Sequence, residues 1–441
     1  MDFYGRENEI SELRKVRETS RKYARFTVVT GRRRIGKTQL IRQALDDGVS
    51  PYVHLVITKK VEKVQTAVHQ RTVESRLGLT FHGVCSRFAE LFEELMKESL
   101  NRSFTLVLDE FQEFDRIDDA IFGEIAGVWD EYHTKSKMNL VVCGSVNRLM
   151  NKIFFDDSQP LYGRSTGKLS LAPFETSVLK KILHDFSPKW KSEDLLSLWT
   201  LTGGVPRYVE LLMENDAFTK SEMLKVVFGG ITSFIDEGRA ILSEEFGKEY
   251  GTYFTILSSI ASGRTTFAEL NNELGADVGG YLTRLESQFG LIAKKQPIYE
   301  TVKTKNCHYQ IEDCFFRFWF RFVVGYQDLI ELNQLDELRE IASRDFEIFS
   351  GYALERYYHW KFQTEKTYVR MGAWWDRKGG NEIDLVCERP KKGGLVFYEI
   401  KRDRKRYSPT ELQAKTLAFI QKNPGLSRMP YACEGLSLAD M

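Results

Sequence analysis

The feature of this chain that most constrains its fold is the segment GRRRIGKT at residues 31–38, which follows an apolar run at residues 26–29. It matches the spacing G-x-x-x-x-G-K-[ST], in which a strand leads into a glycine-rich loop that wraps a triphosphate at a helix N-terminus. Gly31 and Gly36 lack a Cβ atom, so this loop can approach phosphates closely. Residues 39–45 then group apolar side chains on one helical face. We expect a strand, a phosphate-binding loop and a helix, in that order.

The side chains of this loop predict a nucleotide site. Lys37 supplies a cation for the β- and γ-phosphates, and the Thr38 hydroxyl is the expected ligand of the magnesium ion that bridges them. The chain has no guanine-reading N-K-x-D motif, which favours ATP over GTP. The remaining nucleotide contacts are assigned to the loop and the first helical turn, at Gly31, Arg34, Ile35, Gly36 and Gln39.

A second motif, FTLVLDE at residues 104–110, is an apolar strand that ends in two acids. Phosphoryl transfer needs a metal clamp and an oriented water molecule. We therefore assign Asp109 as a magnesium ligand and Glu110 as the catalytic base. Two carboxylates at a strand end are also typical of a solvated terminus. The strongly apolar strand before them and its separation from Lys37 favour the functional interpretation.

Composition narrows the class of protein. The 441 residues suit two or three domains, and 63 basic residues against 62 acidic ones give no global charge that favours nucleic acid or membranes. Six cysteines lie scattered without a C-x-x-C pair, and the N-terminus has no apolar signal core. The most apolar stretch, residues 315–326, is interrupted by Arg317 and Arg321. We expect a soluble cytoplasmic protein with free thiols, no zinc and no membrane association.

Apolar runs at residues 26–29, 51–58, 104–108 and 140–143 alternate with helical patterns. This alternation predicts the α/β fold class, with a parallel sheet that carries helices on both faces. Ligands bind at the carboxyl ends of such strands, where both the glycine loop and Asp109 fall.

Residues 3–9, FYGRENE, resemble the F-x-G-R-x-x-E box that precedes the first strand in archaeal-type AAA+ and STAND-related ATPases. The resemblance supports ATP and implies that Gly5 and Arg6 lie near the adenine. It also implies a sensor-1 role for Ser145 and makes Arg207, after a Gly-Gly-x-Pro turn, a sensor-2-like contact to the γ-phosphate. Arg164 is left open between charge stabilisation and a surface ion pair.

Residues 246–312 resemble a winged helix, with helical patterns at 254–261, 265–270 and 278–289 and two strands at 291–295 and 308–311. The predicted recognition helix has Arg284 as its sole cation. Phosphate contacts need more charge, so this part is expected to pack rather than to read bases. Aromatic-rich residues 315–338 are expected to form a helix that bridges to the last domain.

The final hundred residues resemble the PD-(D/E)-x-K nuclease core, with Asp384 on one strand and Glu399 and Lys401 on the next, antiparallel one. Two such carboxylates converge on a divalent metal, and the lysine lies on the same face as Glu399. The resemblance makes Glu355 an additional acid, and it places Gln413 or Lys415 on a helix beside the site. Alternating charges on the wet face of a half-buried hairpin look similar, and Ile383 replaces the proline.

These patterns give four predicted parts: a P-loop ATPase module with a helical lid (1–245), a winged helix (246–312), a helical linker (313–345) and an α/β nuclease-like domain (346–441). The predicted function is magnesium-dependent ATP hydrolysis that gates cleavage of nucleic acid by a second site holding Mg²⁺ or Mn²⁺. DNA is favoured as partner, and a homo-oligomer is left open. The alternative is an ATP-dependent switch whose C-terminal domain binds nucleic acid or protein without cleavage. A DNA-reading transcription regulator is disfavoured by the sparse charge of residues 278–289.

Overall fold

The computed structural model describes residues 1–229, 234–300, 306–376 and 380–441. The chain forms two compact units, residues 3–173 and residues 174–441, the latter together with residues 1–2. The sequence predicted an ATPase module that includes a helical lid and ends at residue 245. The boundary between the two units lies earlier, at residues 173 and 174, so the helices between residues 174 and 245 belong to the C-terminal unit. The finer divisions at residues 245, 312 and 345 stay predictions.

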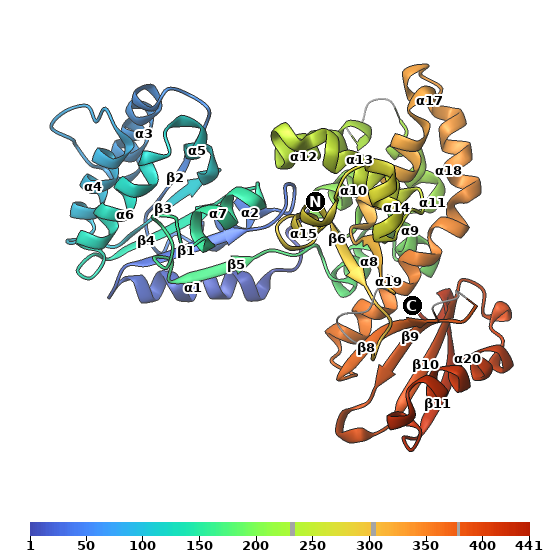
Figure 1. Cartoon of the computed structure of the whole chain (residues 1–441). Coiled ribbons are helices and arrows are strands. Elements are labelled where there is room, and N and C mark those ends of the chain that lie inside the picture. The colour runs from blue at the N-terminus through green and yellow to red at the C-terminus, as the bar shows by residue number, and fades with distance from the viewer. Residues whose placement is uncertain (230–233, 301–305, 377–379) are drawn as a thin grey trace. The chain divides into compact units, whose positions relative to one another are not determined.

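The N-terminal unit is built on a five-stranded parallel sheet in the order β2-β3-β4-β1-β5 (Figure 1). All four neighbouring pairs are parallel, as the alternation of strands and helices predicted. The strands are β1 (Arg25–Thr30), β2 (Tyr52–Val56), β3 (Phe104–Asp109), β4 (Met138–Cys143) and β5 (Gly167–Ser170).

Helices cover both faces of this sheet, because alternate residues of each strand point to opposite sides. Phe26 and Val28 pack into a core with α3, α4, α6 and α7, whereas Val29 packs with α1 and α2 on the other face. The predicted α/β class is therefore confirmed. The helices are α1 (Glu7–Ser20), α2 (Lys37–Leu45), α3 (Glu62–Leu77), α4 (Phe88–Glu98), α5 (Phe114–Ile117), α6 (Ala120–Tyr132) and α7 (Asn147–Phe155).

The C-terminal unit begins with a group of helices, followed by α13 (Tyr250–Ala261), α14 (Phe267–Leu274), α15 (Gly279–Ser287) and an antiparallel pair, β6 (Ile292–Lys295) and β7 (His308–Ile311). This is the order of elements that the sequence predicted, and the identification as a winged helix stays a prediction. Arg284 of α15 pairs with Glu249 at 3.1 Å and lies 4.9 Å from the centre of the Tyr281 ring. Its cation is thus engaged in packing. The first helices are α8 (Thr176–Phe186), α9 (Ser192–Thr202), α10 (Pro206–Glu214), α11 (Lys220–Val227) and α12 (Phe234–Phe246).

The single helix expected over residues 315–338 is wrong as a continuous element. The chain forms α16 (Cys314–Phe318), a π-helical turn at Trp319–Val323, α17 (Gln327–Glu331) and then α18 (Leu335–Phe349). One break falls at Tyr326, with φ of -134° and ψ of 40°. Another falls at Asn333, whose φ of 54° lies in the left-handed region that ends a helix and that asparagine tolerates.

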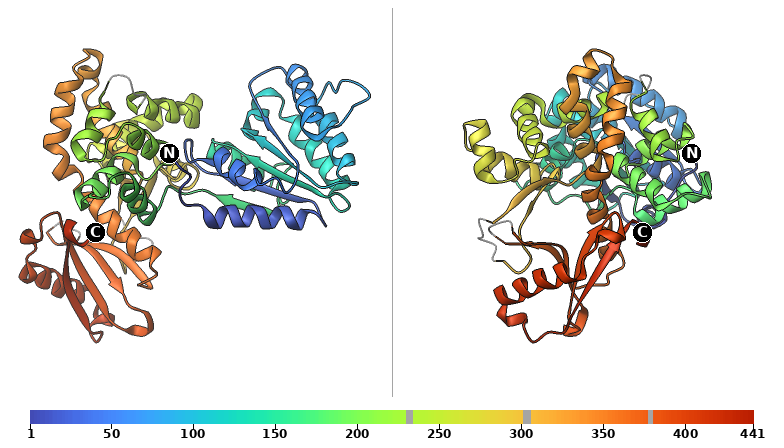
Figure 2. Two further views of the ribbon diagram at one scale, coloured as in Figure 1. Left: turned by 180° about the vertical axis from the view of Figure 1, so that it is seen from behind. Right: turned by 90° about the vertical axis from the view of Figure 1, so that its right-hand side faces the viewer.

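The last part of the chain is a four-stranded mixed sheet in the order β11-β10-β9-β8, with α20 along one face (Figure 2). Leu412 and Phe419 of α20 pack with Phe397, whereas Tyr398, the next residue of its strand, meets Phe362 of α19 on the opposite face. The elements are α19 (Gly351–Thr364), β8 (Arg370–Trp375), β9 (Glu382–Glu388), β10 (Leu395–Lys401), α20 (Pro409–Lys422) and β11 (Tyr431–Ser437).

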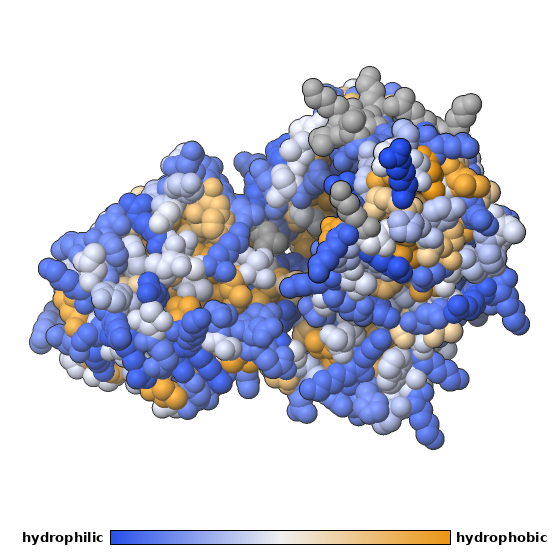
Figure 3. Space-filling view, turned by 90° about the horizontal axis from the view of Figure 1, so that it is seen from below, coloured by the Kyte–Doolittle hydropathy of each residue, from blue (hydrophilic) through white to orange (hydrophobic). Residues whose placement is uncertain are grey.

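On the face drawn in Figure 3, hydrophilic residues predominate and hydrophobic ones lie in small separate groups. Within the described ranges, no helix combines the length and apolar composition needed to cross a membrane.

Candidate functional site

The glycine-rich loop connects β1 to α2 as the sequence predicted. Gly31 and Gly36 have φ values of +149° and +88°, which side-chain-bearing residues rarely adopt, and α2 begins directly at Lys37. A Cβ atom on Gly31 would lie 3.0 Å from the carbonyl oxygen of Leu171. The Lys37 ammonium donates to the carbonyl oxygens of Gly31 (2.8 Å) and Arg32 (3.2 Å), which holds the cation over the loop.

Asp109 is the centre of a buried hydrogen-bond cluster at the end of β3. Its Oδ2 accepts from the Thr38 hydroxyl at 2.7 Å and lies 3.2 Å from His54 Nε2, and its Oδ1 accepts from the Cys143 thiol at 2.9 Å. Burial raises the pKa of this carboxyl, but the hydrogen bonds from His54, Cys143 and Thr38 outweigh it and bring the pKa to about 2. The group therefore stays ionised.

The two side chains predicted to hold magnesium are within hydrogen-bond distance of each other, so a single cation can reach both the Thr38 hydroxyl and the Asp109 carboxylate. An ionised carboxylate and a hydroxyl are oxygen donors of the type that Mg²⁺ prefers, with phosphates and water completing its shell. Thr38 and Asp109 therefore fit a magnesium site.

Glu110 lies next to Asp109 in a left-handed conformation (φ 54°) that turns its side chain toward Ser145. Its Oε2 accepts from the Ser145 hydroxyl at 2.7 Å and from Gln112 Nε2 at 2.5 Å. The predicted base and the predicted sensor-1 residue are thus in direct contact. Gly144 permits this arrangement, because a Cβ there would lie 2.1 Å from Gln112 Oε1.

The arginines assigned by resemblance have local partners. Arg164 pairs with Asp130 at 2.6 Å, which matches the ion-pair alternative left open for it. Arg207 lies on α10 in the C-terminal unit and pairs with Glu210 at 2.7 Å. Its sensor-2 role stays a prediction.

In the C-terminal sheet, β9 and β10 are antiparallel neighbours, as predicted, and they bring Asp384, Glu399 and Lys401 together. The Lys401 ammonium lies 3.1 Å from Glu399 Oε1 and 3.7 Å from Asp384 Oδ2. Lys415 of α20, one of the two residues expected beside the site, lies 3.2 Å from the same Glu399 oxygen. The two carboxylates therefore share one cation, and a second cation faces Glu399.

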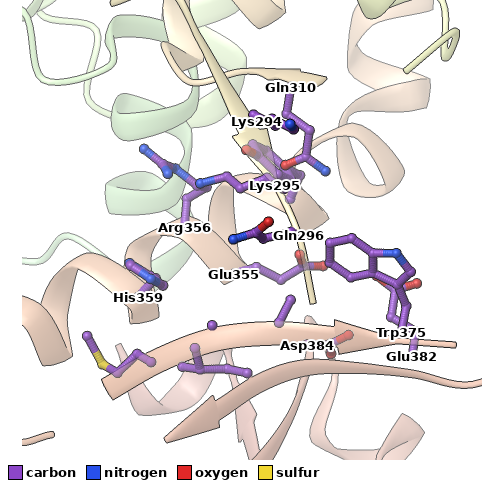
Figure 4. A pocket seen from close by; sticks show the side chains of 15 residues that line it. Lys294, Lys295, Gln296, Gln310, Glu355, Arg356, His359, Trp375, Glu382 and Asp384 are labelled. Atoms are coloured by element: carbon purple, nitrogen blue, oxygen red, sulfur yellow. The ribbon is translucent and has the colours of Figure 1, made fainter. Parts of the chain in front are cut away.

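Further acids crowd this cluster. Burial and the charges of Asp384 and Glu382 raise the pKa of Glu355, and burial together with the charge of Asp384 raises the pKa of Glu382. Burial likewise raises the pKa of Asp384, with the charge of Glu399 adding to it. Figure 4 shows Glu355 on the α19 side, with Glu382 and Asp384 on the strand below. The raised pKa values favour the neutral carboxyl groups, and a bound cation would stabilise their ionised forms.

A divalent cation fits this site by its donor chemistry. Glu399 Oε2 is buried without a hydrogen-bond partner among the described residues, and one or two carboxylates suffice for Mg²⁺, which keeps several water ligands. No group of three or more His, Cys, Asp or Glu side chains in the described ranges is placed to hold a metal. At this site the Lys401 ammonium lies against both carboxylates.

Several residues at these sites were not found by sequence reasoning. His54 and Cys143 contact Asp109 from the two strands that flank β3, and Gln112 contacts Glu110. Glu382 lies two residues before Asp384 on the same strand. The strand positions of His54 and Cys143 were visible in the sequence, but the order of strands in the sheet was not.

The loop, the Asp109 cluster and the parallel sheet make the N-terminal unit similar to P-loop ATPase domains. Residues 3–212 match the family described as "ATPase domain predominantly from Archaea". Residues 319–412 match a second family, described as "Archaea bacterial proteins of unknown function". An uncharacterized protein of Methanocaldococcus jannaschii is 27% identical over 411 residues, which cover 90% of this chain and 87% of that protein.

Two solved structures share the fold at low sequence identity. The Walker-type ATPase of Pyrococcus abyssi is 19% identical with a TM-score of 0.51, covering 73% of this chain and 96% of its own. The ORC2 protein of Aeropyrum pernix, solved in ADPNP and ADP complexes, is 14% identical with a TM-score of 0.52, covering 78% and 96%. These likenesses establish the fold.

Proposed function

We propose that this protein couples magnesium-dependent ATP hydrolysis to a metal-dependent nuclease-like site in its C-terminal unit, which acts on nucleic acid. The observation that carries the nuclease half of the proposal is the convergence of Asp384 and Glu399 on the Lys401 ammonium. The two carboxylates are largely buried, with 13% and 6% of their side chains exposed, and they share one partly buried cation, whereas alternating charges on a solvated hairpin gain little from pairing.

In the ATPase half, each residue has a task that its contacts support. The Lys37 ammonium, poised over the loop carbonyls, binds the β- and γ-phosphates, and Thr38 with Asp109 would hold magnesium. Glu110 accepts the proton of the attacking water, and the Ser145 hydroxyl fixes the orientation of that carboxylate.

In the nuclease half, Asp384 and Glu399 would hold a divalent cation, which supplies Lewis-acid chemistry and lowers the pKa of water when it is bound. Lys401 stabilises negative charge that develops on the phosphodiester, because its ammonium is directed at the same point as both carboxylates. Lys415 holds Glu399 in orientation.

One observation favours the second candidate, an ATP-dependent switch without cleavage. Lys401 and Lys415 both pair with Glu399 Oε1, so the cluster also fits a partly buried ion-pair network that needs no metal. In that case the C-terminal domain binds nucleic acid or a partner protein, and the carboxylates serve its stability.

The test incubates the purified full-length protein with linear, circular and single-stranded DNA and with RNA, in Mg²⁺, Mn²⁺ or EDTA, with and without ATP. Asp384→Asn should abolish cleavage and leave ATP turnover intact, whereas Lys37→Ala should abolish turnover and remove the effect of ATP on cleavage. Asp336→Asn, at an exposed position on α18, is the matched control. Turnover without cleavage of any substrate would refute the nuclease and favour the switch.

A further inference from the structure

A cavity of about 260 Å³ lies directly beside the carboxylates of the nuclease-like site. The hairpin of β6 and β7 forms one wall of it, and α19, β8 and β9 form the others (Figure 4). Asp384, Glu355 and Glu382 line the cavity together with side chains that the proposed cleavage chemistry does not use. Those other polar and aromatic side chains are Lys294, Lys295, Gln296, Gln310, Tyr352, Arg356, His359 and Trp375.

A fixed aromatic ring lies at one end of the cavity. Trp375 is the strand neighbour of Glu382, and the two side chains lie together in Figure 4. The indole N–H donates to Asn306 Oδ1 at 3.0 Å, and the ring of His308 lies 5.4 Å from the indole. These contacts hold the partly buried indole in one orientation, which is what a stacking platform for a nucleobase requires.

Two amides extend from the hairpin into the same space. Within the described ranges, neither Gln296 nor Gln310 donates or accepts a side-chain hydrogen bond, and both line the cavity (Figure 4). Glutamine offers a donor and an acceptor together, which is the pattern that pairs with the edge of a base. Lys294, on the same hairpin, is exposed and forms no ion pair with the described residues, so its cation is available for a phosphate.

The size of the cavity limits what can enter it. A volume of about 260 Å³ corresponds to a sphere about 8 Å across, whereas the major groove of B-DNA alone is about 12 Å wide. A double helix therefore cannot enter. A single base that is unpaired, or turned out of its stack, fits the space and the lining.

We propose that this cavity binds one unpaired nucleotide, whose base stacks on Trp375 and hydrogen-bonds to Gln296 and Gln310, next to the Asp384 carboxylate. The inference rests on the proposed function, because it names the substrate class of the same site: a single-stranded or locally unpaired nucleic acid. Lys294 contacts the adjoining phosphate.

Binding of labelled oligonucleotides to the full-length protein, measured by fluorescence anisotropy in EDTA, tests this directly. The probes are a blunt duplex, the same duplex with one unpaired nucleotide, that duplex with an abasic residue in place of the unpaired one, and single strands of DNA and RNA. The unpaired and single-stranded probes should bind at least about tenfold more tightly than the blunt and abasic ones, since the stacked base supplies the difference.

Single substitutions show which residues of the cavity cause the preference for unpaired nucleotides. Trp375→Ala and Gln310→Ala should each reduce the preference severalfold, Trp375→Phe should largely keep it, and Gln421→Ala, at an exposed position on α20, should leave it unchanged. Melting curves establish that each variant is folded, and the abasic probe tests the proposal on the wild type alone. Equal binding of abasic and unpaired probes would overturn it.

The same proteins separate this inference from the proposed function. If Asp384→Asn keeps the preference for unpaired probes and no protein cleaves any of them, the pocket stands and the nuclease fails. If a blunt duplex is cleaved with no preference for unpaired nucleotides, the nuclease stands and the pocket fails.

Discussion

Replacing Glu110 by glutamine separates catalysis from folding at the ATPase site. The Glu110 Oε2 atom accepts one hydrogen bond from Ser145 and one from Gln112. A glutamine amide has the same shape, and its single oxygen can take both bonds if the NH₂ group turns the other way. What the variant lacks is a group that can accept a proton from water.

The expected magnitudes differ widely. Because both hydrogen bonds can be retained, the free energy of unfolding should change by less than about 1 kcal/mol. Loss of a general base typically lowers a rate by about 10²- to 10⁴-fold, or roughly 3 to 5 kcal/mol in activation free energy. ATP affinity should be unchanged, since Lys37 and Thr38 are untouched.

Phosphate release measures the rate of ATP hydrolysis, and binding of a fluorescent ATP analogue measures nucleotide affinity. Urea unfolding measures the free energy of unfolding. Glu113→Gln is a suitable control, because Glu113 is also buried close to the site but pairs with Arg116 at 3.1 Å. If Glu110→Gln hydrolyses ATP at the wild-type rate, Glu110 is not the base. If Glu110→Gln weakens ATP binding or lowers the free energy of unfolding as much as it slows hydrolysis, Glu110 has a structural role.

Two substitutions test the packing on which the sites depend. Gly144→Ala should destabilise the N-terminal unit by about 1–3 kcal/mol, because the alanine Cβ would lie 2.1 Å from Gln112 Oε1 and 2.5 Å from Met150 Sδ. Urea unfolding measures the loss, and an unchanged midpoint of the unfolding curve would contradict this geometry. Ile298→Ala should lower the free energy of unfolding by about 2–5 kcal/mol, since Ile298 is buried in the same core cluster as Trp374. An unchanged melting temperature of the C-terminal unit would refute that packing.

The parts of the ATPase site that the sequence predicted are those encoded by neighbouring residues. The loop needs positive φ at Gly31 and Gly36, and glycine at a fixed spacing before Lys37 is a local signal for that conformation. The apolar strand before Asp109 likewise fixes the place of that carboxylate at a strand end. Local backbone requirements of this kind can be read from a single sequence.

The partners of Asp109 could not be predicted, because they come from separate strands. His54 on β2 and Cys143 on β4 reach Asp109 only because these strands flank β3. The order of strands in a parallel sheet depends on crossover connections and packing, which no local pattern specifies. The same holds for the cavity beside Asp384, one wall of which is a hairpin about 70 to 90 residues earlier in the chain.

The hairpin that walls this cavity is fixed to the sheet that carries the acids. Ile298, just after β6, donates its backbone N–H to the Ala373 carbonyl at 2.9 Å, and the Tyr299 hydroxyl donates to Glu388 at 2.7 Å. A Cβ on Gly372 would lie 3.2 Å from Ile298 Cβ, so the two segments are in close contact. Opening the cavity by lifting the hairpin would break this buried packing. If ATP gates cleavage as proposed, we therefore expect the hairpin and the acid-bearing strands to move as one body.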